Sequence, residues 1–88
     1  MSMLSWYEKA WDDYCAWQSK DKKTLKRINM LLEDIQRNGH QGIGSPEPLK
    51  GDLSGCWSRR IDEKNRLVYT IENGTIFILK CGSHYGDK

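Results

Sequence analysis

One amphipathic segment, residues 22–38, constrains the fold more than any other part of this sequence. An Asn38-Gly39 pair at its end supplies the stop signal of a helix. A helix with a single apolar stripe must bury that stripe against another element. The stripe recurs at the spacing of one helix face: Leu25, Ile28, Leu31 or Leu32, and Ile35.

A second helix is predicted just upstream, over residues 8–18. Trp11, Tyr14 and Cys15 fall at positions i, i+3 and i+4, which places them on one face. With Trp17, the two aromatic residues are expected in a core between helices and sheet. Residues 19–21 are polar and offer an N-cap for the following helix. Because this link is short, we expect the two helices to be antiparallel.

Strand patterns fill the C-terminal half. Residues 56–61 and 66–71 flank a turn-like quartet, and residues 76–81 follow Asn73-Gly74, a strong hairpin signal. Residues 1–6 predict a short first strand at a sheet edge. Strands after a helix pair indicate an α+β fold, with two antiparallel N-terminal helices packed on one face of a small antiparallel β-sheet. We expect residues 1–88 to form a single domain.

Alternation along residues 66–71 assigns the two faces of this sheet. Leu67, Tyr69 and Ile71 share the side that suits the helices, whereas Arg66 and Val68 share the other side. Arg66 is therefore expected on an open face of the sheet. Trp57 and Tyr69 are expected to be packing residues, and His40, in a glycine-rich loop, is given no role.

Bulk properties narrow the class of protein. The chain has 88 residues and a net charge of +2, which alone does not diagnose nucleic-acid binding. Its three cysteines, Cys15, Cys56 and Cys81, are far apart, which argues against a disulfide framework or a zinc site and for reduced thiols in a cytoplasm. No apolar run approaches the roughly 20 residues of a membrane span, and no secretory signal is evident.

The loop over residues 39–52 contains the most unusual carboxylate. Glu47 lies between Pro46 and Pro48, and each proline favours an extended conformation at the residue before it, which predicts extended Ser45 and Glu47. A glutamate in such a loop is ordinarily a solvated side chain. Here cations follow on the predicted hairpin and a histidine follows near the C-terminus. A carboxylate, a histidine and several cations are the groups needed to cleave RNA through its own 2′-hydroxyl.

A long motif resembles a known family. The stretch over residues 46–69 reads PEPLKGDLSGCWSRRIDEKNRLVY; WDDY precedes it at residues 11–14, and His84-Tyr85 follows it. This combination is similar to the YoeB/Txe branch of the RelE toxin superfamily. The resemblance implies a microbial RNase fold and a bacterial, cytoplasmic, ribosome-dependent endoribonuclease that cuts mRNA in the A site. It also implies that a YefM/Phd-like antitoxin neutralises the toxin and that operator DNA is contacted only through the antitoxin complex. The toxin of such a family can also form a homodimer.

The resemblance carries roles to individual residues. Glu47 corresponds to the general base, Arg66 to the arginine that supports the scissile phosphate, and His84 to the general acid, with Tyr85 beside it. The implied chemistry needs neither metal nor cofactor and leaves a 2′,3′-cyclic phosphate and a 5′-hydroxyl. Three further cations are implied as RNA contacts: Lys50, Arg59 and Arg60.

The chain departs from the family pattern at its end. The family commonly closes on Cys-Arg-x-His-Tyr, whereas this chain has Gly82 and Ser83 before His84-Tyr85 and continues to Lys88. This change motivates an alternative, a weakly active toxin-like module that acts mainly as antitoxin partner and transcriptional co-repressor. A third reading is an RNA-binding module without catalysis. Its support is the basic side of the second helix: Lys22, Lys23, Lys26, Arg27 and Arg37.

Overall fold

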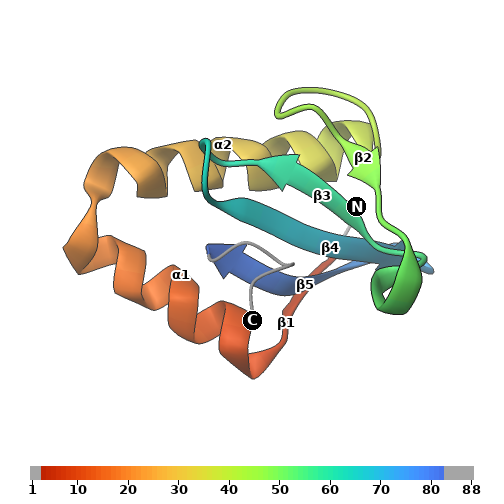
Figure 1. Ribbon diagram of the computed structural model, residues 1–88, viewed down its shortest axis with the longest axis horizontal. Helices are drawn as coiled ribbons and strands as arrows, with labels where there is room; N and C mark the ends of the chain where they lie inside the picture. Colours follow the sequence, from red (N-terminus) through yellow and green to blue (C-terminus); the bar gives the residue numbers. More distant parts are fainter. Residues whose placement is uncertain (1–2, 83–88) are drawn as a thin grey trace.

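The computed structural model describes residues 3–82, in which two helices lie against one face of a five-stranded sheet (Figure 1). Strands run in the order β1-β5-β4-β3-β2 across the sheet. This arrangement confirms the predicted α+β class. In chain order the elements are β1 (Met3–Trp6), α1 (Glu8–Lys20), α2 (Lys22–Asn38), β2 (Glu47–Pro48), a short 3-10 helix (Gly51–Leu53), β3 (Trp57–Arg60), β4 (Arg66–Glu72) and β5 (Thr75–Gly82).

The second helix has the ends that its sequence predicts. The Asp21 carboxylate accepts hydrogen bonds from the backbone N–H groups of Lys23 and Thr24, at 3.1 and 3.2 Å, and so caps the N-terminus. At the other end Gly39 adopts a φ of +68°, and its N–H donates to the carbonyl of Ile35 at 2.9 Å. Four residues of the apolar stripe are buried: Ile28, Leu31, Leu32 and Ile35.

Two features of the sheet differ from the sequence-based expectation. The first strand does lie at an edge, but it pairs parallel with β5, so the sheet is mixed and the expectation of antiparallel pairing throughout was wrong for this strand. In the sequence, both helices come after β1 and before the other strands. They therefore supply the crossover connection that parallel pairing needs. The other edge strand, β2, was not predicted because two residues are too short to show alternation.

The pairing of β4 with β5 contains a β-bulge. Tyr69 lies opposite Ile78, and Val68 lies opposite Lys80, so Leu79 is an extra residue on β5. Leu67 and Tyr69 nevertheless face the helices as predicted, because the extra residue is on the partner strand. The bulge changes which β5 residues face the core. Ile76 and Ile78 face it before the bulge, and Cys81 faces it after the bulge.

The core lies between the helices and this face of the sheet. Tyr14 packs against the core and Trp17 is buried within it, as expected, but Trp11 is 47% exposed. Trp11 instead contacts Trp6 edge-on, with ring centroids 5.5 Å apart. No helix in the described part of the chain is long and apolar enough to cross a membrane.

Candidate active site

The open face of the sheet, opposite the helices, gathers the charged residues of interest. Register places Glu47 opposite Ser58, Ser58 opposite Val68, and Val68 opposite Lys80, so these four residues form one row across β2, β3, β4 and β5. Directly opposed residues point to the same face, and neighbouring strands lie about 4.8 Å apart. The row therefore spans roughly 14 Å.

Arg60 and Arg66 form the next row of the same face. They are directly opposite each other on β3 and β4, a position in which like charges destabilise a sheet unless an anion lies between them. Neither arginine has a carboxylate within ion-pair distance among residues 3–82. One guanidinium nitrogen of Arg66, Nη1, is buried and has no hydrogen-bond partner in that part of the chain. An anion bound between the two arginines would offset their repulsion.

Glu47 reaches this face through β2. The strand is short, but the hydrogen bonding between the two segments continues beyond it. The backbone N–H of Leu49, just after β2, donates to the carbonyl of Cys56, just before β3, at 2.9 Å. Glu47 is extended, as predicted, and exposed. Ser45 was also predicted to be extended, and this prediction was wrong, because its φ is +50°. The carbonyl of the neighbouring Gly44 accepts a hydrogen bond from the Arg60 N–H at 2.7 Å.

Ser58 lies between the carboxylate and the cations of the open face. Its hydroxyl oxygen is buried and has no hydrogen-bond partner among the described residues. Buried hydroxyls are nearly always paired, so this group is an exception within the described chain. Sequence reasoning gave Ser58 no role, because its position beside Glu47 depends on the two-residue strand that alternation does not reveal.

The hairpin that presents Arg60 and Arg66 is closed by Asp62. Its carboxylate accepts hydrogen bonds from the backbone N–H groups of Lys64 and Asn65, at 2.8 and 2.7 Å. The Ile61 N–H donates to the Asn65 carbonyl at 3.0 Å. These bonds set the register that brings the two arginines opposite each other.

Arg59 does not fit its predicted role as an RNA contact. The residue is fully buried on the helix side of the sheet, one position out of phase with Arg60. Its Nη1 donates to the Asp34 carboxylate at 2.6 Å. The remaining donors serve backbone carbonyls and a phenol: Ile43 at 2.7 Å, Gly39 at 2.7 Å, Gln41 at 3.1 Å, and the Tyr69 hydroxyl at 3.2 Å.

This buried arginine ties the long loop to the helix and sheet. The hydrogen bond from Arg59 is the main cause that lowers the pKa of the Asp34 carboxyl below its ordinary value of 3.8. His40, for which no role was predicted, stacks on Trp57 with ring centroids 4.1 Å apart. Burial, and then the charge of Arg59, lower the His40 pKa from 6.5, which keeps the ring neutral.

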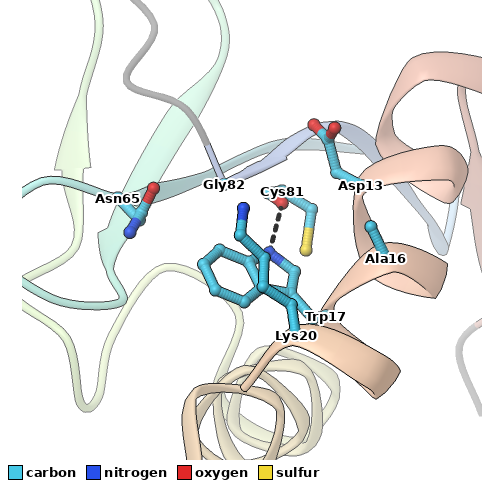
Figure 2. A pocket seen from close by; sticks show the side chains of 7 residues that line it. All are labelled: Asp13, Ala16, Trp17, Lys20, Asn65, Cys81 and Gly82. Atoms are coloured by element: carbon cyan, nitrogen blue, oxygen red, sulfur yellow. Dashed lines mark hydrogen bonds between the residues drawn. The ribbon is translucent and has the colours of Figure 1, made fainter. Parts of the chain in front are cut away.

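A cavity of about 180 Å³ lies beside the end of β5, away from the open face (Figure 2). The Trp17 indole N–H donates to the Cys81 carbonyl there at 3.0 Å, which fixes the strand end from which residues 83–88 continue. Burial, and to a lesser degree Asp13, raise the pKa of the Cys81 thiol to about 12. A thiol with that pKa stays protonated near neutral pH and is therefore a poor nucleophile.

The remaining predicted site residues are placed as follows. Lys50 is exposed and follows β2, at the N-terminus of the 3-10 helix, and it forms no ion pair with a carboxylate among residues 3–82. His84 and Tyr85 lie outside the described residues. In the described part of the chain no cluster of three or more histidine, cysteine or acidic residues could hold a metal ion.

The fold and the open face define a class: a small α+β domain with a carboxylate and paired arginines on a solvent-facing sheet. Comparison with known proteins identifies the family within that class. Residues 6–85 match the model of the YoeB-like toxin of bacterial type II toxin-antitoxin systems. The chain is 50% identical to Toxin YoeB of Escherichia coli K12 over 82 residues, which cover 93% of this chain and 98% of the relative. This chain belongs to the YoeB-like toxin family.

Solved structures agree with this assignment. The toxin in a heterotetrameric YoeB-YefM toxin-antitoxin complex from Staphylococcus aureus superposes with a TM-score of 0.88 at 45% identity, covering 97% of this chain and 99% of that one. A YoeB dimer from the same organism superposes with a TM-score of 0.88 at 46% identity, covering 96% and 98%. The similarity therefore extends over nearly the whole fold.

Proposed function

We propose that this toxin is a ribosome-dependent endoribonuclease that cleaves mRNA in the ribosomal A site of the bacterial cytoplasm and so inhibits translation. The observation that carries the proposal is the Arg60–Arg66 couple, which has no carboxylate partner among residues 3–82 and shares one open face with Glu47. A phosphodiester supplies the anion that this couple lacks within the described residues. Arginine suits that role because its planar fork donates to two phosphate oxygens at once.

The reaction follows from the residue types. Glu47 removes the proton of the ribose 2′-hydroxyl, and the 2′-oxygen forms a bond to the adjacent phosphorus. Arg66, with Arg60, donates hydrogen bonds to the non-bridging oxygens as their negative charge grows. The bond to the 5′-oxygen breaks, and His84 donates the proton that this oxygen takes, with Tyr85 beside it. The products are a 2′,3′-cyclic phosphate and a 5′-hydroxyl, and no metal takes part.

The same cationic face explains what neutralises the toxin. A YefM/Phd-like antitoxin with an acidic segment that folds on binding would cover Arg60 and Arg66 and exclude RNA. The Staphylococcus aureus relative in complex with YefM supports this partner. Operator DNA would be reached only through the antitoxin complex, and the YoeB dimer of that organism supports a homodimer for this chain as well.

Cleavage of a ribosome-programmed mRNA tests the proposal. We expect wild-type protein to cut at the A-site codon, and Glu47→Gln to cut about 10² to 10⁴ times more slowly, the usual contribution of a positioned base. His84→Ala should lose activity as well. Glu63→Gln is the matched control, because Glu63 is an exposed glutamate in the 62–65 turn. A fully active Glu47→Gln protein, or equal losses in both glutamate variants, would overturn the assignment.

One observation favours the weaker alternative of a mainly regulatory module. Gly82 has a φ of +151°, and a Cβ at this position would lie 3.2 Å from the Trp17 indole nitrogen. The backbone here is therefore unsuited to the arginine that the family pattern places before His84-Tyr85. If folded wild-type protein failed to cut but formed an antitoxin–operator complex, the regulatory role would replace the nuclease role.

A further inference from the structure

We propose that Lys80 is an additional phosphate-binding residue of the open face, placed there by the β-bulge at Leu79. This inference deepens the proposed function and rests on the same face binding RNA. In this inference a cation on β5 binds a phosphate of the substrate, on the side of Arg66 away from Glu47. The RNA would then cross the sheet from β2 towards β5.

The bulge is what turns Lys80 outward. In a regular strand, residues 76, 78 and 80 share one face, and Ile76 and Ile78 are buried in the core. Simple alternation would therefore bury Lys80. Because Leu79 is an extra residue, Lys80 instead lies opposite Val68, which shares the open face with Ser58 and Glu47. Bulges commonly redirect a side chain in this way beside a functional site.

The position of Lys80 complements the two arginines. Lys80 is one strand spacing and two residues along from Arg66, so their Cα atoms are roughly 8 Å apart. A lysine side chain is long enough to span much of that distance, and Lys80 is only partly exposed. The open face thus carries one cation on each of three neighbouring strands: Arg60 on β3, Arg66 on β4 and Lys80 on β5.

No other residue near the end of β5 can supply this charge within the described chain. Gly82 pairs with Arg66 but has no side chain, and its backbone directs a Cβ towards Trp17 rather than towards the open face. Cys81 is buried on the helix side. Lys80 is therefore the cation through which β5 contributes to the face.

Binding to non-cleavable, programmed ribosomes tests this inference independently of catalysis. The probe is a 70S ribosome whose mRNA carries 2′-deoxyribose throughout the A-site codon, and each variant is made in a Glu47→Gln background. Affinity is measured at several salt concentrations. Lys80→Ala should weaken binding about tenfold and lower the slope of log affinity against log salt by about 0.7, the loss of one phosphate contact on a single strand.

Two further variants separate RNA binding from a structural role. Lys80→Arg keeps the charge and should restore both affinity and salt slope. Lys9→Ala removes an exposed lysine from α1, in the helix layer, and should change neither. Unchanged affinity in Lys80→Ala, equal losses in Lys80→Ala and Lys80→Arg with a lowered melting temperature, or no ribosome binding at all would each overturn the inference. If wild-type protein did not cut but binding still depended on Lys80, only the nuclease proposal would fail.

Discussion

At the scale of single residues, two adjacent arginines have opposite environments. Arg59 is buried and its guanidinium is fully engaged with helix, loop and sheet, whereas the exposed Arg60 faces the solvent across from Arg66. Strand alternation separates them, but the sequence Arg-Arg alone gives no reason to choose which is buried. The choice depends on Asp34, which is 25 positions away in the chain.

Conservative substitutions should distinguish these two arginines. Arg59→Lys keeps the charge but has three N–H donors for the five acceptors that Arg59 serves, so at least two of these acceptors lose their donor. We expect the free energy of unfolding to fall by about 3 kcal/mol. Arg60→Lys should change it by less than about 0.5 kcal/mol, since the side chain is exposed. Urea unfolding of both variants is the measurement, and similar losses would contradict the structural role of Arg59.

Acid should destabilise the fold in two stages around the same network. His40 has a folded-state pKa below its ordinary 6.5, so its contribution is complete above pH 6.5 and declines as the pH falls below that value. Asp34 has a folded-state pKa below 3.8, so its contribution is present above pH 3.8 and is lost as the pH falls further. His40→Gln should remove the first stage only. Chemical unfolding between pH 8 and pH 3 measures both, and an unchanged first stage would exclude His40 as its cause.

At the scale of elements, the sequence predicted the helices and strands that have a regular hydrophobic period or a local capping or turn signal. The stripe of α2, the N-cap expected within residues 19–21, and the hairpin at Asn73-Gly74 are local signals, and each was confirmed. The parallel pairing of β1, the two-residue β2 and the bulge at Leu79 depend on contacts between distant segments. Alternation therefore placed Arg66 correctly but could not place Ser58 beside Glu47 or turn Lys80 outward.

The loop before β2 packs closely on α2 and β3 at Gly44. A Cβ at Gly44 would lie 2.7 Å from Leu31 Cδ2 and 3.3 Å from the Arg60 nitrogen, at a φ of +81°. Gly44→Ala should therefore lower stability by about 2 kcal/mol or more, from overpacking added to backbone strain.

Gly55→Ala is the control for Gly44→Ala. Gly55 also has a positive φ, +95°, but a Cβ there meets nothing within 4 Å. Its cost should be about 1 kcal/mol, from backbone strain alone. Thermal unfolding compares the two variants, and equal shifts in melting temperature would show that the loop is not packed tightly on α2 and β3.

At the scale of the whole molecule, the sheet separates stability from function. One face packs on α1 and α2 through an apolar core and the Arg59 network, and the other carries Glu47, Arg66 and Lys80. This separation leaves the open face to a substrate, because the fold draws its stability from the opposite side. It also gives an antitoxin a cationic surface to cover.

The measurement that tests the central claim most directly replaces the attacking group of the substrate. Wild-type protein is given programmed ribosomes whose A-site codon carries either ribose or 2′-deoxyribose at every position, and the fragments are sized and their ends identified. We predict that the ribose codon is cut, with 2′,3′-cyclic phosphate and 5′-hydroxyl ends, and that the deoxyribose codon stays intact. Cleavage within the deoxyribose codon, or no cleavage of the ribose codon by folded protein, would contradict the account.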